Sequence, residues 1–520
     1  MTDLTSADQQ LRQLISDGKS GRLLIIGGGI TGAATFAKAA AAGFEPWLIE
    51  QNDFTSGTSS RSSKMLHGGL RYLAQGDIAI VRESAREINW FRQHLPQHVK
   101  PLAYVFIHQP GKVPSPWLFD KVLSGYDLLT HNKRHHRLTQ SEIKLLLPQL
   151  TKHDFDANLF YDSITDDCAL VLSLLQTGVK YGGLCANYLK VTKVQRPDST
   201  SIVTLTDTIN GTSEQIECDF VINATGAWAG QLHPPKQATI KPVRGSHITL
   251  PFWKIPTAVS IAFSHPQDGR PVYIYPWAGV TVVGCTELVH QPSLDQCPTI
   301  SLAEQQYLLA AVNHLDWQHT FSSDDIIATW AGVRPIISKS TDLSDLNHEP
   351  RKHQIWQQPG MISIAGGKLV SAMPMANDIL TAAAKQKSWI FNPNQQLELS
   401  CFVPPNSPKL LRDVISSSAI KNLGDLLLRR SRLGLTMGVA LKQHQTSIAQ
   451  LCQQYLHWSE QKFEQQWQQY WQHWQQSYSS AVSLDQQNQA TLSEPAGDND
   501  LIQKTTHAAP QQSDIPQLNH

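Results

Sequence analysis

The feature that most constrains this chain is a glycine-rich turn near its N-terminus. An apolar run at residues 23–26 leads into Gly27-Gly28-Gly29-Ile30-Thr31-Gly32, an alanine-rich helix-forming stretch follows, and residues 46–50 make a second short apolar strand that ends in Glu50. Strand, turn, helix, strand and acid in this order indicate a dinucleotide-binding unit. We expect Gly27, Gly29 and Gly32 to let backbone approach a pyrophosphate and pack the helix, and Glu50 to accept hydrogen bonds from ribose hydroxyls.

The segment that follows, DFTSGTSSRSSKMLHGGLRY at residues 53–72, is rich in hydroxyls and glycines. Short hydroxyl side chains donate hydrogen bonds, and glycines let backbone approach a flat ring. The run closely resembles FAD-dependent glycerol-3-phosphate dehydrogenases and oxidases, within the wider D-amino-acid-oxidase-like superfamily. The resemblance implies that this segment contacts FAD through Thr58, Ser59, Ser60, Ser62, His67, Gly68 and Gly69.

Further matches to this family run in order to about residue 375. The NATGAW element at 223–228 resembles the family's NATGPW, and it implies that Ala224, Thr225 and Gly226 pack against the dinucleotide. The GGKL element at 366–369 implies that Gly366, Gly367, Lys368 and Leu369 lie beside the flavin. No motif indicates a covalent link through His or Cys, so we expect FAD to be non-covalent.

The substrate side requires cations and a base, because oxidation of a phosphorylated alcohol needs groups that hold a phosphate and a group that takes the hydroxyl proton. The family pattern implies substrate binding by Arg71, Tyr72, Arg334, Arg351 and Lys368, with Arg334 and Arg351 on the phosphate. His247, in a Gly-Ser-His setting, is our candidate base because imidazole titrates near neutral pH. We expect His247, Arg334 and Lys368 to be catalytic.

The resemblance implies oxidation of sn-glycerol 3-phosphate to dihydroxyacetone phosphate, with hydride passing to flavin N5 and electrons onward to a quinone. Two alternatives remain open. The family's GGKLTTYR reads GGKLVSAM at 366–373, so another hydroxy acid or an amine is an alternative substrate. The second alternative is a non-catalytic module that binds FAD and responds to redox state or binds a partner. Retention of four candidate residues argues against it: Arg71, His247, Arg334 and Lys368.

Composition narrows the class further. Lys+Arg and Asp+Glu both number 43, which disfavours a nucleic-acid partner. The seven cysteines are scattered without ligand spacing, so we expect no metal site and a cytoplasmic protein. No apolar stretch approaches the length of a spanning helix. Peripheral contact with the cytoplasmic face of the inner membrane, a homodimer, and quinone or oxygen as the acceptor all remain open.

We expect an α/β chain (α+β overall) in which a Rossmann-like FAD-binding domain is interleaved with a β-rich substrate domain and followed by a small helical cap. The expected divisions are a polar lead-in at 1–20, the oxidoreductase unit at 21–388, the cap at 389–480 and a disordered tail at 481–520. The cap keeps LLRRSRLG at 427–434, which resembles the family's LRRRTKLG, but is shorter than usual. Aromatic residues repeat at helical spacing over 463–478. Core packing is favoured there over a membrane or partner surface, because no Lys/Arg stripe accompanies them.

Overall fold

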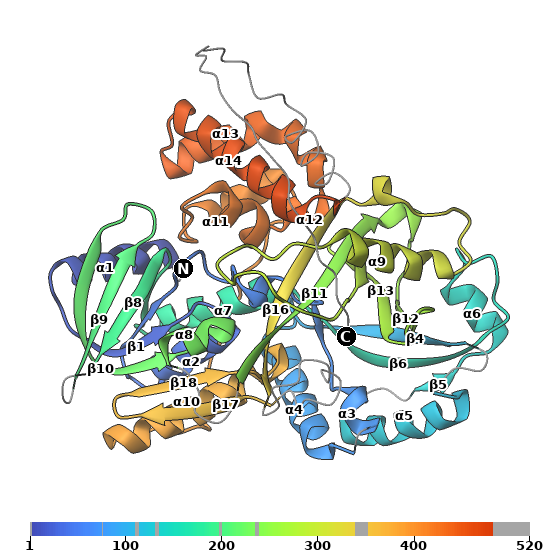
Figure 1. The fold of residues 1–520 in the computed structure, drawn as a ribbon, viewed down its shortest axis with the longest axis horizontal. Coiled ribbons are helices and arrows are strands. Elements are labelled where there is room, and N and C mark those ends of the chain that lie inside the picture. The colour runs from blue at the N-terminus through green and yellow to red at the C-terminus, as the bar shows by residue number, and fades with distance from the viewer. Residues whose placement is uncertain are drawn as a thin grey trace, which may run out of the picture.

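The computed structural model describes residues 3–74, 76–109, 114–130, 135–196, 200–233, 239–338 and 352–481. Two β-sheets lie side by side, and a helical cap sits above them (Figure 1). The α/β architecture is the expected one: a Rossmann-like sheet interleaved in sequence with a second, mainly antiparallel sheet.

The first sheet has a parallel centre, in which β18, β10, β1, β2 and β7 run in the same direction. Its path is β17 (Gln354–Gln358), β18 (Met361–Ala365), β10 (Ser213–Asn223), β1 (Gly21–Ile26), β2 (Pro46–Ile49) and β7 (Leu184–Ala186). One face is covered by α2 (Ile30–Ala41), α7 (Asp167–Lys180) and α10 (Ala372–Lys387), which pack against Leu23 and Ile25 of β1. Burial on both faces explains the continuous apolar run in β1.

The opposite face is covered by the antiparallel pair β8 (Leu189–Gln195) and β9 (Ser201–Asp207), which extends from β10, and by α1 (Leu4–Ser16). Residues 1–20 were expected to be a polar lead-in, but α1 buries Leu11 and Ile15 on this face. Its Arg12 Nη1 donates to Asp207 Oδ2 over 2.6 Å. The helix is therefore part of the packed domain.

The second sheet follows the path β15 (Leu288–Val289), β11 (Thr239–Pro251), β14 (Val280–Gly284), β13 (Pro271–Trp277), β12 (Ser260–Ser264), β4 (Lys100–His108), β6 (Asp156–Ile164) and β3 (Met65–Leu66). In addition, β16 (Ala328–Ser338) pairs with β11, and β5 (His136–Arg137) pairs with β6. Strands β13 and β14 form a β-hairpin. Its turn residues Ala278 and Gly279 have φ of 47° and 87°, as a two-residue hairpin turn requires.

Helices cover the second sheet and join it to the first. α9 (Leu302–His314) packs on β11 and β14. The lower part of the molecule in Figure 1 holds α3 (Leu70–Ala74), α4 (Ile78–His94) and α5 (Pro116–Thr130), while α6 (Gln140–Leu146) lies near β6. No helix in these described residues is long and apolar enough to cross a membrane.

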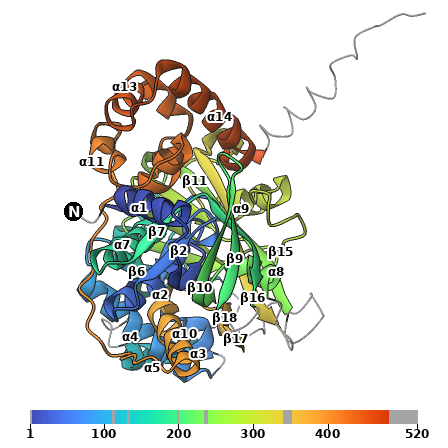
Figure 2. The ribbon, with the colours of Figure 1, turned by 90° about the vertical axis from the view of Figure 1, so that its left-hand side faces the viewer.

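The cap comprises α11 (Arg412–Ile415), α12 (Leu433–Thr436), α13 (Gln445–Leu456) and α14 (Glu460–Tyr478), and Figure 2 shows it above the first sheet. The aromatic face of α14 is buried, which confirms core packing; its members are Phe463, Trp467, Tyr470, Trp471, Trp474 and Tyr478. Residues 425–444 form a π-helical turn (Asp425–Arg430), α12 and a 3-10 helix (Gly438–His444), and Arg432 between the first two has a left-handed φ of 65°. Of the expected disordered tail at 481–520, Ala481 is described and is only 3% exposed, so the prediction is wrong for this residue, and residues 482–520 lie outside the described residues.

Candidate functional site: a cavity between the two sheets

One cavity lies at the carboxyl end of the parallel strands, where open α/β sheets bind ligands. It extends from the end of β2, through the turn after β1, to residues of β16 and the segment after β18. Many expected cofactor residues line it: Gly27, Gly29, Glu50, Thr58, Ser59, Ser62, His67, Ala224, Thr225, Gly226, Gly366, Gly367, Lys368 and Leu369. Residues that the family resemblance implies for cofactor binding thus lie around one cavity in the folded chain.

The glycine turn leaves backbone exposed where a pyrophosphate would lie. Gly27 has φ of 110°, and a Cβ there would be 2.7 Å from the carbonyl oxygen of Ala224. At Gly32 a Cβ would be 1.9 Å from the carbonyl oxygen of Gly27, so only glycine allows the helix this close to the turn. The amide of Ile30, in the first turn of α2, donates to Ser59 Oγ over 2.9 Å. A helix N-terminus with amide donors is a ready site for an anion.

Glu50 marks the other end of the cavity. Its Oε2 accepts from the amide of Gly28 over 2.7 Å, and its Oε1 accepts from the amide of Asn52 over 3.0 Å. Burial raises the pKa of this carboxyl, and the two amides oppose the rise. Leu189 and Val191 of β8 line the same end and offer an apolar wall for an adenine. These residues fit the adenosine half of FAD, and the cavity continues far enough to hold the flavin half.

Four of the expected cofactor residues support the cavity without lining it. Gly32 packs α2, as described above. The carbonyl of Ser60 accepts from Lys64 Nζ over 2.5 Å. Gly68 donates its amide to Asp162 over 3.2 Å, and a Cβ on Gly68 would be 2.4 Å from the hydroxyl of Tyr126. Gly69 makes the turn into α3 with φ of 85°.

The cations lie at the end of the cavity away from Glu50. Arg334 lines it, donates to Cys285 Sγ over 3.1 Å and lies 3.7 Å from Glu287. Lys368 and Tyr72 also line it, and Lys368 Nζ lies 3.8 Å from the centroid of the Tyr72 ring. Arg334 and Lys368 are two of the cations that line the cavity, and two such cations together suit a phosphate. The backbone of Arg71 is in α3 but its side chain is not described, and Arg351 lies outside the described residues.

His247 is buried beside this end but does not line the cavity. Its ring stacks on Trp330 at 4.9 Å, and its Nε2 lies 2.9 Å from Ser63 Oγ. Burial, followed by the charges of Arg334 and Lys64, holds the pKa of His247 well below its usual value. The expectation that this imidazole titrates near neutral pH is therefore wrong. Ser63, which lines the cavity and contacts His247, was not among the predicted site residues.

Two glycines, Gly245 and Gly284, make room for the side chains of Arg334 and His247. A Cβ at Gly284 would be 2.1 Å from Cδ2 of His247, and a Cβ at Gly245 would be 2.7 Å from Nη2 of Arg334. Both glycines belong to strands of the second sheet. This sheet therefore supplies the side chains of His247 and Arg334 as well as the space that they occupy. The Gly-Ser-His and Gly-Cys-Thr-Glu motifs are the signals that could have revealed this.

Buried ion pairs attach the cap to residues 52–61, most of which line the cavity and which are called the cofactor loop below. The guanidinium of Arg430 donates to both oxygens of Asp53 over 2.7 Å, and Arg429 also pairs with Asp53. Arg432 likewise pairs with Asp166 and with Asp167. Arg430 has Asp53 as its paired acid, so removing Asp53 would leave that buried charge without its partner. The LLRRSRLG motif therefore joins the cap to the cofactor loop.

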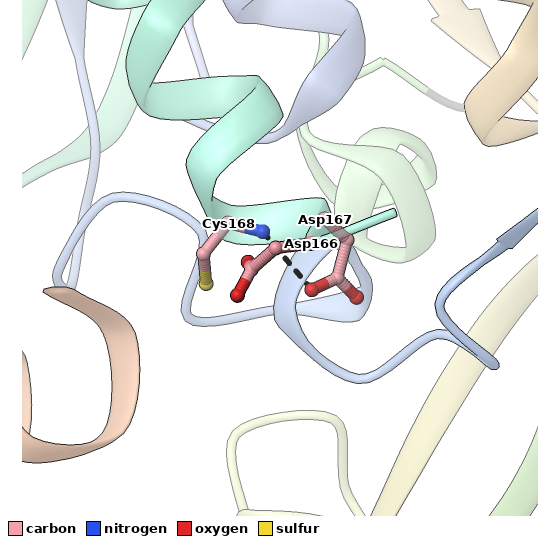
Figure 3. Close-up of side chains that lie close together, drawn as sticks. All are labelled: Asp166, Asp167 and Cys168. Atoms are coloured by element: carbon pink, nitrogen blue, oxygen red, sulfur yellow. Dashed lines mark hydrogen bonds between the residues drawn. The ribbon is translucent and has the colours of Figure 1, made fainter. Parts of the chain in front are cut away.

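Asp166, Asp167 and Cys168 lie close together at the start of α7 (Figure 3), within 4.8 Å of one another. Asp166 caps the helix, and Asp167 accepts from the amide of Cys168 over 2.9 Å. The acids already contact cations, since Asp167 Oδ2 lies 2.8 Å from Lys64 Nζ and Arg432 pairs with both. The cluster is therefore explained as part of the cap contact, without a metal ion.

Comparison with known proteins agrees with this geometry. Residues 22–373 match the model of a family described as FAD dependent oxidoreductase. An aerobic glycerol-3-phosphate dehydrogenase of Bacillus subtilis is 31% identical over 69% of this chain and 66% of its own length. One of Staphylococcus haemolyticus is 30% identical over 70% of this chain and 67% of its own. The chain thus spans about two thirds of the length of these curated relatives.

Solved structures show the same fold. A glycerol-3-phosphate dehydrogenase from Bacillus halodurans complexed with FAD has a TM-score of 0.72 at 21% identity, covering 92% of this chain and 98% of that one. An L-α-glycerophosphate oxidase from Mycoplasma pneumoniae with FAD bound has a TM-score of 0.57 at 15% identity, covering 73% and 98%. At these identities the likeness concerns the fold.

Proposed function

The chain belongs to the family of FAD-dependent oxidoreductases, and we propose that it oxidises sn-glycerol 3-phosphate to dihydroxyacetone phosphate. FAD is its cofactor. The observation that carries the proposed substrate is the pair of cations, Arg334 and Lys368, at the same end of the cavity as Gly366 and Gly367. The curated relatives named as glycerol-3-phosphate dehydrogenases support this substrate.

Bound FAD supplies a hydride acceptor at N5. Arg334 and Lys368 hold the phosphate dianion of the substrate, and this fixes the alcohol carbon against the flavin end of the cavity. As the C2 hydrogen leaves as hydride, the hydroxyl proton passes to Ser63 Oγ, which gives its own proton to His247 Nε2. The low pKa of His247 keeps the imidazole neutral before the substrate binds but makes it a weak base. A bound phosphate beside Arg334 offsets one of the charges that lowers this pKa, and the ring then becomes a better proton acceptor.

The altered segment after Lys368 bears on the alternative substrates. Of residues 370–373, Val370 lines the cavity, whereas Ala372 and Met373 are buried at the start of α10. The Oγ of Ser371 accepts from the amide of Lys368 over 2.9 Å and so supports the glycine-rich turn. The departure from the family pattern thus falls mainly on packing, which favours the phosphorylated alcohol over another hydroxy acid or an amine.

The proposed substrate is tested by steady-state kinetics with an artificial dye as the electron acceptor. Arg334→Gln removes one phosphate-binding cation, so we expect KM for glycerol 3-phosphate to rise about tenfold or more. Arg137→Gln, which removes a half-exposed surface arginine of β5, serves as the matched control and leaves KM unchanged. Equal KM values for Arg334→Gln and the wild type would contradict the assignment.

We also propose a quinone as the final electron acceptor, reached by peripheral contact with a membrane. Trp117 and Leu128 of α5 are 70% and 76% exposed, and exposed aromatic and aliphatic side chains favour a membrane boundary. Sedimentation with anionic phospholipid vesicles tests the contact, and Trp117→Ser together with Leu128→Ser should reduce the bound fraction. The same protein, reduced without oxygen, should be reoxidised faster by a soluble quinone than by air. We also propose that the protein forms a homodimer, and measurement of its molecular mass in solution tests this.

A further inference from the structure

A second cavity lies at the seam between the cap and the cofactor loop. It is lined by residues within 52–61, the cofactor loop, by residues within 290–298 after β15, by Tyr188, Ile209, Trp228 and Val333, and by the cap residues Lys421, Asn422, Leu423, Gly424, Arg429, Gln466, Gln469, Tyr470 and His473. Two acids are among these residues: Asp53, which pairs with Arg429 and Arg430, and the exposed Asp295. It shares Thr58, Arg61 and Trp228 with the FAD cavity, so the two are neighbours with a common wall. None of the substrate-binding residues proposed above lines this second cavity.

Arg61 is a buried cation without an acidic partner among the described residues. Its side chain is 7% exposed, and it donates to Cys297 Sγ over 3.0 Å, to the carbonyl of Pro298 over 3.4 Å and to the hydroxyl of Tyr478 over 3.0 Å. All three acceptors are neutral, and its Nε has no partner in this part of the structure. A buried charge left without an opposite charge costs several kcal/mol as a rule.

The other buried arginines of this region behave differently. Arg429 and Arg430 pair with Asp53, and Arg432 pairs with Asp166 and Asp167. Each therefore has its opposite charge within the protein. Arg61 is the exception among these four, which indicates that its counter-charge comes from outside the described chain.

Further unpaired hydrogen-bonding groups line the same cavity. The hydroxyl of Tyr470, both ring nitrogens of His290 and Nε1 of Trp228 have no partner among the described groups, and Tyr470 and His290 are only 3% and 4% exposed. The guanidinium and indole nitrogens can only donate, and the hydroxyl donates as well. A ligand that matches them must offer acceptor oxygens. One uncompensated positive charge with surrounding donors matches a carboxylate.

We propose that the seam cavity binds a small organic carboxylate, with its carboxyl group on Arg61 and the rest of the molecule between Tyr470 and residues 290–298. Because the cavity joins the cap to the cofactor loop and shares a wall with the FAD cavity, a bound carboxylate stabilises the docked cap and alters the surroundings of the flavin. The site is separate from the phosphate end of the FAD cavity, so its existence does not depend on glycerol 3-phosphate being the substrate.

The test is isothermal titration of the FAD-saturated full chain with malonate, at constant ionic strength and with chloride as the salt control. We expect saturable binding with a dissociation constant at or below about 1 mM, and a small change in the flavin spectrum. Arg61→Gln should weaken malonate binding by about tenfold or more, because a charged hydrogen-bond donor is lost. Tyr470→Phe, which removes a group that does not line the FAD cavity, should weaken it by a smaller factor.

Lys421→Gln is the matched control, since Lys421 lines the same cavity but pairs with Asp8 of α1. It also removes one positive charge, yet binding should stay within about twofold of the wild type. Failure of the FAD-saturated wild type to bind malonate would overturn the proposal, as would equal losses in Arg61→Gln and Lys421→Gln. If Arg61→Gln no longer retains FAD, Tyr470→Phe decides alone, and unchanged binding in that variant would overturn the proposal.

Discussion

Asp53→Asn is the change that tests how the cap is attached. The Asp53 carboxylate is fully buried and accepts from Arg430 through two bonds of 2.7 Å, from Arg429, and from Asn187 over 2.9 Å. An amide of the same size cannot neutralise a guanidinium group, so Arg430 loses its paired acid and its charge stays buried, whereas Arg429 keeps its ion pair with Asp425. Loss of one partner from a buried ion pair costs about 3–5 kcal/mol. We expect the free energy of unfolding, measured by urea denaturation at pH 7, to fall by that amount.

The matched control is Asp156→Asn, whose partner Arg137 lies 2.6 Å away in a pair that is about half exposed. Exposed pairs contribute about 0–1 kcal/mol, so this variant should unfold almost as the wild type does. Burial raises the pKa of Asp53, but Arg430 and Arg429 outweigh it, and the net pKa is lowered. The contribution is therefore present above the ordinary pKa of an aspartate and is lost as pH falls through the lowered pKa. Equal losses of stability in the two variants at pH 7 would refute the reasoning.

Two further predictions concern the proton acceptor. Gly284→Ala places a Cβ 2.1 Å from Cδ2 of His247, so the ring must move. We expect kcat to fall about 10²-fold at unchanged FAD content. Gly125→Ala in α5 is the control, because its Cβ would meet only Leu73 at 3.7 Å, and its kcat should stay near the wild-type value. Because the pKa of His247 is held well below 6.5, kcat/KM should remain constant from about pH 8 to pH 6 and decline only at lower pH. An acid limb with an apparent pKa near 6.5 that disappears in His247→Asn would show that the histidine titrates normally and would contradict this account.

Local patterns predicted many of the residues that line the cavity. The turn at Gly27–Gly32 and the acid at Glu50 are adjacent in sequence and form one βαβ unit, so their arrangement follows from local geometry. The strand over 220–222 is also recognisable in the sequence, because full burial gives a continuous apolar run there. Features of this kind need no knowledge of which strands pair.

The remaining features depend on contacts between distant segments. Ser63 and His247 are 184 positions apart, and the low pKa of His247 arises from burial between sheets that no single segment reveals. Asp53 pairs with Arg430 across 377 positions. A residue type alone predicts a charge or a usual pKa, whereas its burial and its partner decide what that charge does.

We propose above that the protein oxidises glycerol 3-phosphate with FAD bound in this cavity. The most direct measurement is anaerobic mixing of the FAD-loaded protein with glycerol 3-phosphate while the flavin absorbance is followed, with glycerol as the control for the phosphate. The account predicts rapid bleaching by glycerol 3-phosphate, little by glycerol, and a much slower response in Arg334→Gln. Normal reduction by dithionite with no bleaching by glycerol 3-phosphate would contradict it.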